Sequence, residues 1–181
     1  MSLPSLVALP TSLQPLVTRA EETFLDALRD TSEQAEQLFS AWPASRREAF
    51  GRVCAASDFV SEQVSRDPEM LLQLAESGLL ERSLKEGEMR AALTELLGDC
   101  TDEDSLARRL RRFRNRQQVR IIWRDLTRQA ALAETCGDLS DMADASIDLA
   151  YQWLYKRHCE QFGVPTGRRS GDAQHMVVLG M

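Results

Sequence analysis

Arginines recur at a strict interval of four residues in the second half of this chain. The members of this arginine row are Arg108, Arg112, Arg116, Arg120, Arg124 and Arg128. Because a guanidinium group stays charged and donates paired hydrogen bonds, it binds carboxylates and phosphates. Residues four apart are neighbours on an α-helix, and each step of four drifts by about 40°, so the row winds slowly around one helix. The row predicts a surface for an anionic partner, with these six arginines as the partner-binding residues.

A structural use of the row is the competing interpretation. Residues 1–105 carry 20 acids and nine bases, whereas residues 106–128 carry nine arginines and one acid. Three further acids, Asp141, Asp144 and Asp148, share one face of the following helix and would meet the arginines across an antiparallel hairpin. From the residues alone we favour ion pairs within the chain over a ligand site.

Nucleic acid is a third conceivable partner for an arginine-rich helix, since its phosphates attract guanidinium groups. The segment 106–128 contains no lysine and no glycine loop, and it lacks interleaved exposed aromatic residues. The whole chain carries a net charge of −6. These features argue against nucleic-acid binding.

The sequence contains no complete catalytic constellation. Its four cysteines lie far apart without a CxxC or Cys–His cluster, which argues against zinc. His158 and Cys159 are adjacent, and adjacent helical side chains point about 100° apart, so they do not form a nucleophile–base pair. Acids such as Asp141 and Asp144 near a helix start are typical helix-dipole partners. We predict no catalytic residue and no metal ligand in this chain.

The elements that position the row are helices. Good helix formers dominate the 181 residues, with only six prolines and nine glycines, and 43% hydrophobic residues support a packed core. No segment approaches the roughly 18 apolar residues of a membrane span, and no basic segment precedes Leu3–Leu9 as in a secretory signal. We predict an all-α multi-helix bundle with long C-terminal helices, in the cytoplasm, with reduced cysteines.

Composition divides the chain into four regions. They are a lead-in (1–14), an acidic helical region (15–100), an arginine-rich helical hairpin (101–165), and a loop with a strand (166–181). Asp67 and Pro68 predict a helix start, as N-cap and first helical residue. Gly137 and Asp138 predict the break between the two helices of the hairpin, with the second helix at about 139–162.

The apolar residues of the arginine helix change face along its length. Leu106, Leu110 and Phe113 share one face, whereas Val119 and Trp123 lie on a nearly opposite one. We therefore expect its two halves to pack against different partners. Three more aromatic residues at helical spacing are predicted to be core, namely Tyr151, Trp153 and Tyr155.

The last seven residues, His175–Met181, are typical of a buried β-strand that enters a glycine turn. A lone strand has no neighbour to pair with. The segment is therefore either a tail lying on the bundle or the first strand of a second domain.

Four stretches carry a family resemblance. They are SDFV (Ser57–Val60), LARRLRRFRNRQQVRIIWRDLT (Leu106–Thr127), DLAYQWLYKRHCEQFGVP (Asp148–Pro165) and the terminal MVVLGM. In this order and spacing they resemble the N-terminal part of the bifunctional glutamine synthetase adenylyltransferase/adenylyl-removing enzyme family. The resemblance covers most of residues 57–181 and is weaker before residue 57.

This resemblance implies a much longer parent chain with two nucleotidyltransferase domains. One adds AMP from ATP to a tyrosine of glutamine synthetase, and the other removes it with phosphate and releases ADP. Glutamine and the PII signal protein control which activity runs, so nitrogen assimilation is regulated. Glutamine synthetase and PII are thus the implied partners, and Mg²⁺ and ATP/ADP the implied cofactors of the parent.

The resemblance also implies where the chemistry lies. The family's first active site begins with a strand and a glycine turn, LGMGKLGG, followed by an SDxDL segment with metal-binding aspartates. This chain supplies Gly180 of that turn as its one cofactor-binding residue, but neither the lysine nor the aspartates. The implication is a non-catalytic helical region without a cofactor of its own. The alternatives are a free-standing helical protein-interaction module and an arginine-rich nucleic-acid-binding protein.

Overall fold

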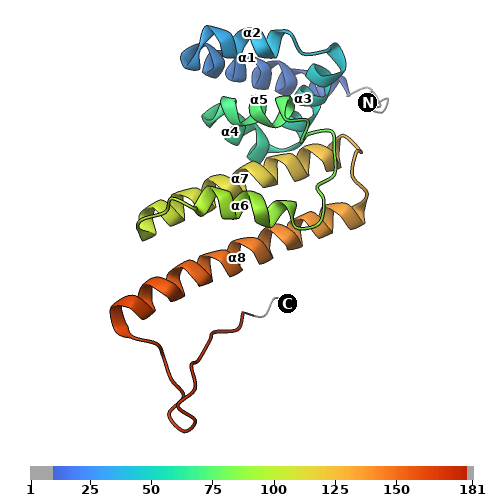
Figure 1. Ribbon diagram of the computed structural model, residues 1–181. Coiled ribbons are helices and arrows are strands. Elements are labelled where there is room, and N and C mark those ends of the chain that lie inside the picture. The colour runs from blue at the N-terminus through green and yellow to red at the C-terminus, as the bar shows by residue number, and fades with distance from the viewer. Residues whose placement is uncertain (1–9, 179–181) are drawn as a thin grey trace. The chain divides into compact units, whose positions relative to one another are not determined.

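The computed structural model describes residues 10–178, and the regular elements among them are helices (Figure 1). After a 3-10 turn (Thr11–Leu13), the α-helices are α1 (Gln14–Thr31), α2 (Glu33–Ser40), α3 (Ala44–Ala56), α4 (Asp58–Arg66), α5 (Pro68–Glu76), α6 (Glu88–Leu97), α7 (Glu103–Leu126) and α8 (Leu132–Phe162). Between residues 10 and 178 there is no named strand, and one isolated bridge joins Thr166 and Ala173. The predicted all-α class is confirmed.

The chain forms two compact units, and neither is continuous in sequence. The first contains the described residues up to Lys85 together with Arg114–Leu139. The second contains Glu86–Phe113 together with the described residues from Ser140 onwards. Helices α7 and α8 therefore each contribute to both units. The division into four regions by composition stays a prediction.

Side-chain caps set where several helices begin. The Met70 N–H donates to Asp67 Oδ1 at 3.1 Å, with Pro68 in the first turn of α5, as the sequence predicted. At the start of α7 the Ser105 N–H donates to Asp102 Oδ1 at 2.7 Å. The Asp102 N–H donates back to Ser105 Oγ at 3.3 Å. The hydrogen bond that the Ser105 N–H donates to the Asp102 carboxylate lowers the pKa of Asp102.

An aromatic cluster fills the core of the first unit. Phe24 of α1 lies 5.0 Å from Phe39 of α2 and 4.8 Å from Phe50 of α3, measured between ring centroids. Trp42 extends the cluster to Trp123 of α7, with centroids 6.4 Å apart. Edge-to-face and tilted contacts of this kind add to the hydrophobic stabilisation of a core. Trp123 thereby fixes the second half of α7 to the unit that contains α1–α5.

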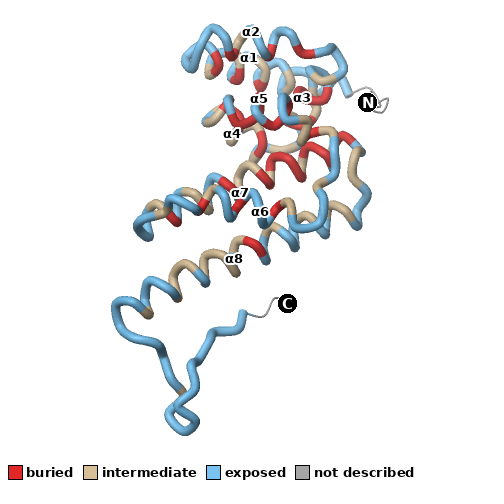
Figure 2. The backbone as a smooth tube through the Cα atoms, viewed as in Figure 1, coloured by how far each residue is buried: buried red, intermediate tan, exposed pale blue. Residues whose placement is uncertain are grey.

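The second unit has a smaller core. Its buried apolar residues come from α6, from the first half of α7 and from α8, and they are Met89, Leu93, Leu97, Leu106, Phe113 and Ala145. Figure 2 shows α8 mostly exposed or half-buried along its length. Tyr151, Trp153 and Tyr155 are half-buried, so the prediction that they are core residues is only partly met.

The change of apolar face along α7 has the predicted consequence. Leu106 and Phe113 are buried in the second unit, whereas Val119 and Trp123 are buried in the first. One helix thus supplies apolar residues to two cores. This explains why its polar residues, the arginines above all, also change surroundings along its length.

The predicted helix break at Gly137 is wrong. Helix α8 is continuous from Leu132 to Phe162 and includes Gly137 and Asp138. A glycine inside a helix costs about 1 kcal/mol relative to alanine, which the many other residues of α8 offset. The second helix of the hairpin therefore begins seven residues earlier than predicted, at Leu132 rather than about residue 139.

The actual break lies at residues 127–131, where an arginine takes the place usual for glycine. Arg128 has φ 57°, and its N–H donates to the Asp125 carbonyl at 3.0 Å. The Gln129 N–H donates to the Arg124 carbonyl at 2.8 Å, which completes a Schellman motif at the end of α7. Because glycine normally marks this position, an arginine there conceals the helix end from sequence analysis.

The C-terminal segment turns back after α8. Gly163 ends the helix with φ 84°, and the loop predicted at 166–174 contains the bridge between Thr166 and Ala173. Residues 174–178 have no regular secondary structure. The predicted strand continues beyond them, and Gly180, the predicted cofactor-binding residue, lies outside the described residues.

A pair of glycine substitutions tests these helix boundaries. Gly137→Ala should raise the free energy of unfolding by about 0.5–1 kcal/mol, because alanine favours the helix and its Cβ would meet no atom within 4 Å. Gly163→Ala has equally open surroundings but a positive φ, so it should lower that free energy by about 1 kcal/mol. Urea denaturation measures both, and effects of the same sign would contradict the assigned boundaries.

Candidate functional site

The structure separates the arginine row into exposed and buried members. Arg108, Arg112 and Arg128 are exposed, and Arg116 is half-buried. Arg120 and Arg124 are buried, with 0% and 2% of their surface exposed. A buried guanidinium group must find partners for its charge and its N–H groups. The row is therefore not a single surface.

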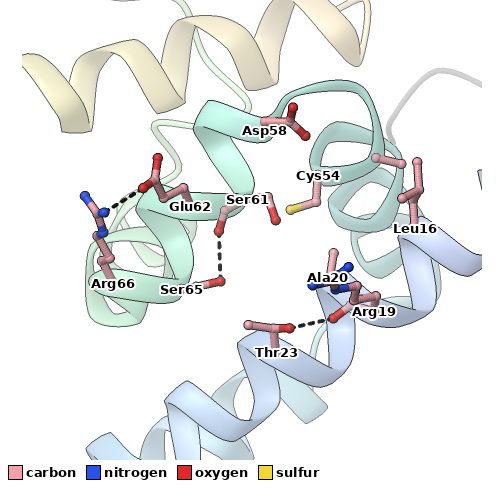
Figure 3. A pocket seen from close by; sticks show the side chains of 11 residues that line it. Leu16, Arg19, Ala20, Thr23, Cys54, Asp58, Ser61, Glu62, Ser65 and Arg66 are labelled. Carbon is pink, nitrogen blue, oxygen red and sulfur yellow. Dashed lines mark hydrogen bonds and ion pairs between the residues drawn. The ribbon is translucent and has the colours of Figure 1, made fainter.

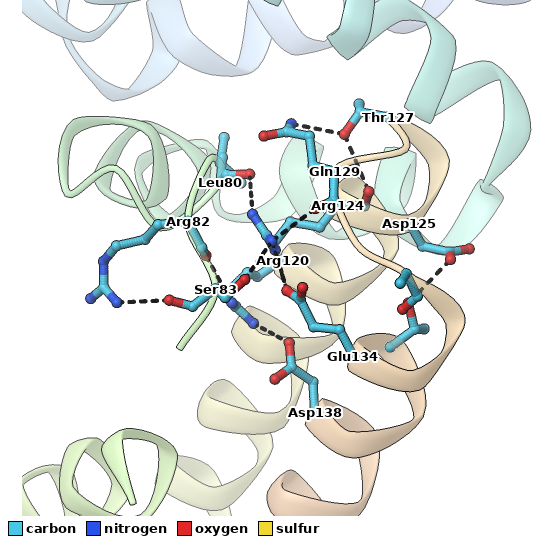
Figure 4. A network of polar contacts seen from close by, with 12 residues as sticks. Leu80, Arg82, Ser83, Arg120, Arg124, Asp125, Thr127, Gln129, Glu134 and Asp138 are labelled. Carbon is cyan, nitrogen blue, oxygen red and sulfur yellow. Dashed lines mark hydrogen bonds and ion pairs between the residues drawn. The ribbon is translucent and has the colours of Figure 1, made fainter. Parts of the chain in front are cut away.

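Arg120 is paired inside the first unit. Its Nη1 donates to Asp138 Oδ2 at 2.6 Å, and its Nη2 donates to the Arg82 carbonyl at 3.1 Å (Figure 4). Asp138 comes from the beginning of α8, and Arg82 from the segment between α5 and α6. One side chain thus connects α7 to two other parts of the chain.

Arg124 makes a second and denser set of contacts one turn further along. Its Nε and Nη2 both donate to Glu134 Oε1, at 3.1 and 2.6 Å. Nη2 also donates to Ser83 Oγ at 3.2 Å and to the Gln129 carbonyl at 3.1 Å, and Nη1 to the Leu80 carbonyl at 3.5 Å. Figure 4 shows these partners converging on the guanidinium group from three segments.

The chemistry of this buried arginine pair is structural. Two acids of α8, Glu134 and Asp138, neutralise the two guanidinium groups. Backbone carbonyls and Ser83 Oγ accept further hydrogen bonds, while Arg120 Nε has no hydrogen-bond partner. Removal of one member of such a pair leaves an uncompensated charge, which costs about 3–5 kcal/mol. Arg120 and Arg124 present almost no surface to a partner, so partner binding by the row stays a prediction for its exposed members.

The acids that pair with the row differ from those that the sequence suggested. Glu134 and Asp138 lie before the predicted start of that helix, because the helix break was misplaced at Gly137. Asp148 instead forms an ion pair with Arg90 of α6 in the second unit. Hydrogen bonds from Arg90 first, and then from Gln152, lower the pKa of the Asp148 carboxyl.

An exposed arginine face remains on the first half of α7, formed by Arg108, Arg111 and Arg112. Their spacing of three and four residues places them on one side of the helix. Arg109 turns away from this face, and its Nη1 donates to the Leu96 carbonyl at 2.5 Å. Arg111 was not among the predicted residues, because it lies three residues after Arg108 and so falls outside the interval of four. This exposed arginine face can attract carboxylates or phosphates.

The first unit has a cleft of about 430 Å³ between α1, α3 and α4 (Figure 3). Arg19 and Thr23 line one side of it, and Ser61 and Ser65 line the other. Cys54 lies at its base, where burial, and then the nearby Glu21, raises the pKa of the thiol to about 12. Because the thiolate is the reactive form, Cys54 is chemically inert at neutral pH.

The described residues offer no metal site. Between residues 10 and 178, no three His, Cys, Asp or Glu side chains gather so that they could hold a metal ion. His158 Nε2, on α8, instead lies 3.9 Å from Glu103 Oε1, and the His158 ring stacks on the ring of Phe162. The residues present therefore do not fit the Mg²⁺ that the family resemblance implies for the parent.

Comparison with known proteins assigns the chain to a family. The family model of glutamate-ammonia ligase adenylyltransferase matches residues 47–181. This chain belongs to that family. The matched range includes α7, α8 and the segment that follows, which were the stretches that carried the resemblance.

The curated relatives that match this chain are much longer than it is. The chain is 64% identical over all of its 181 residues to the bifunctional glutamine synthetase adenylyltransferase/adenylyl-removing enzyme of Pseudomonas syringae pv. tomato. It is 60% identical over the same length to the Pseudomonas aeruginosa enzyme of that name. A Thioalkalivibrio sulfidiphilus relative is 38% identical over 178 residues. The chain spans 18% of the length of the first two relatives and 17% of the third.

None of the helices within residues 10–178 combines the length and the apolar character needed to cross a bilayer.

Substitution of the buried arginines should be far more damaging than substitution of exposed ones. Arg120→Met and Arg124→Met should each lower the free energy of unfolding by about 3–5 kcal/mol, because Asp138 and Glu134 lose their counterions. Arg108→Met and Arg111→Met are matched controls on the same helix and should change it by about 0.5 kcal/mol or less. Thermal and urea denaturation measure the difference.

A double variant separates the ion pair from simple packing. Arg120→Met combined with Asp138→Leu removes both charges and should recover a large part of the loss of the single variant. An equal decrease in the free energy of unfolding for the buried and the exposed single variants would contradict a structural role for the buried arginine pair.

Proposed function

We propose that this chain is the amino-terminal helical region of the enzyme that adenylylates and deadenylylates glutamine synthetase. Its task there is to support a nucleotidyltransferase sheet and to help present the protein substrate. Family membership supports the assignment, together with the names of the relatives. The parent transfers AMP from ATP to a tyrosine of glutamine synthetase and removes it by phosphorolysis, which gives ADP.

The observation that carries the supporting role is an uncovered apolar surface in the second unit. Met176, Val177 and Val178 expose 61%, 77% and 50% of their surface, and Ile147 of α8 is also exposed. Together with Ala143 and Tyr151 they line an open cleft of about 510 Å³. Apolar side chains gathered in this way are typical of a surface that another element covers. A sheet that begins with residues 175–181 is the element that we infer.

Catalysis belongs to residues outside this chain. Mg²⁺ and ATP/ADP are cofactors of the parent, and Mg²⁺ neutralises phosphate charge when it is bound. The resemblance implies that the metal-binding aspartates of the SDxDL segment are not among the residues of this chain, so this chain alone is proposed to be inactive. Its contribution to the nucleotide site is limited to Gly180, in the glycine turn.

Recognition of the protein substrate is assigned to the exposed arginine face. Arg108, Arg111 and Arg112 present three guanidinium groups on one side of α7, and they fit an acidic surface of glutamine synthetase or of the PII signal protein. Such contacts operate in the cytoplasm, where we place the enzyme. Nucleic acid is a poorer match, because the exposed arginine face carries no aromatic residue on which bases could stack.

An activity comparison tests the proposed division of labour. Phosphate-dependent release of ADP from adenylylated glutamine synthetase should be absent with this chain. It should appear with a chain extended through the glycine turn and the SDxDL aspartates. The matched control is the extended chain with both aspartates changed to asparagine, which should be inactive. Activity in this chain by itself would contradict the proposal.

Charge reversal tests the recognition role. Arg108→Glu combined with Arg111→Glu in the extended chain should raise KM for adenylylated glutamine synthetase about tenfold or more and make it less dependent on salt. The free energy of unfolding should stay within about 1 kcal/mol, since both residues are exposed. Lys156→Glu, an exposed reversal on α8, is the control. An unchanged KM in the double variant would remove the exposed arginine face from substrate recognition.

A further inference from the structure

Two tyrosines of α8 hold the backbone of the segment that follows the helix. Tyr155 Oη donates to the Gln174 carbonyl at 3.2 Å. The Met176 N–H donates to Tyr151 Oη at 3.0 Å. Tyr151 and Tyr155 thus contact alternate residues of one segment from positions four apart on one helix.

The chain reaches these tyrosines through a short reversal after α8. The Gln174 N–H donates to the Pro165 carbonyl, and the Gly167 N–H to the Asp172 carbonyl, both at 2.8 Å. The segment then runs back along α8, from Tyr155 towards Tyr151. Its next residues, Met176–Val178, line the same cleft as Ile147 and Ala143, one and two turns before Tyr151.

The spacing of the two tyrosines matches an extended chain. Four residues of α-helix rise about 6 Å, and two residues of extended backbone span about 6.6 Å. A helix that presents a hydroxyl every fourth residue can therefore contact every second residue of a strand-like segment. A slip by one residue would turn these backbone groups to the other edge of the segment, away from both hydroxyls. Tyr151 Oη also lies 3.4 Å from Nδ1 of His175, the residue between the two held by backbone hydrogen bonds.

Ring contacts reinforce this arrangement. The rings of Tyr151 and Tyr155 lie 5.5 Å apart, and the ring of His175 lies 4.8 Å from that of Tyr155. His175 is the residue between the two that are held by hydrogen bonds. Burial of the apolar side chains does not hold the segment, because Met176 and Val177 are largely exposed. The tyrosine hydroxyls and the tilted Tyr155–His175 ring contact therefore hold the segment against α8, in addition to the hydrogen bond from the Gln174 N–H to the Pro165 carbonyl.

We propose that Tyr151 and Tyr155 are positioning residues, which fix the path and register of residues 174–178 and so set where the predicted first strand of the catalytic sheet begins. The second half of this inference rests on the proposed function, since it requires that the strand belong to that sheet. The first half concerns only contacts within this chain. The tyrosines act through the segment that they hold and touch no reacting group.

Hydrogen exchange in the 181-residue chain tests the first half. Tyr151→Phe removes the acceptor of the Met176 N–H and should speed exchange of that amide about 3- to 10-fold, as expected for the loss of one hydrogen bond. Exchange of the Gln174 N–H, whose acceptor is the Pro165 carbonyl, should change less. Lys156→Gln, at an exposed position of the same helix, should alter neither amide. Unchanged exchange at Met176 in Tyr151→Phe would overturn the proposal.

Kinetics of the extended chain test the second half. The combination of Tyr151→Phe and Tyr155→Phe should lower kcat for phosphate-dependent ADP release about 3-fold or more and leave KM for adenylylated glutamine synthetase unchanged. Substrate docking does not depend on these hydroxyls, whereas strand placement does. An unchanged kcat would overturn the positioning role. An extended chain that is inactive even with both tyrosines would instead count against the proposed function, and the exchange result would still decide the tyrosine contacts.

Discussion

Charge compensation inside the first unit is the constraint on which the hairpin of α7 and α8 depends. Arg120 and Arg124 lie within a core that also contains Trp123, and their guanidinium groups need partners there. Glu134 and Asp138 must therefore stand at the start of α8, and the segment that contains Leu80 and Arg82 must direct its carbonyls inwards. The positions of two helices and one long connection follow from two guanidinium groups.

The same helix shows how one residue type can serve two purposes. In the second half of α7, Arg120 and Arg124 lie in a core and are matched by acids and carbonyls, whereas the half-buried Arg116 donates to Gln73 Oε1. In the first half, Arg108, Arg111 and Arg112 face solvent, because the apolar side of the helix has shifted. A charge excess that looks uniform in the sequence is thus divided by burial into a structural part and an exposed part.

Much of the fold could be predicted because local signals agreed with packing. Asp67 with Pro68 marked a helix start, and the shift in apolar face between Phe113 and Trp123 marked two core faces of one helix. The end of α7 could not be predicted, because Arg128 occupies a left-handed position that glycine usually takes, while the exposed Gly137 is an ordinary helical residue. The pairing of Arg120 with Asp138 was missed for the same reason. The tyrosine contacts depend on a chain reversal that sequence periodicity does not encode.

The discontinuity of the two units has a consequence for any attempt to divide this protein. Each unit is assembled from two separate stretches of chain, and α7 and α8 both pass from one unit to the other. A single truncation therefore cannot isolate either unit, because a chain that keeps both stretches of one unit also keeps one stretch of the other. Dissection of this region calls for a direct link between the two stretches of a unit, or for paired fragments that reassemble, rather than for shorter and shorter versions of the chain.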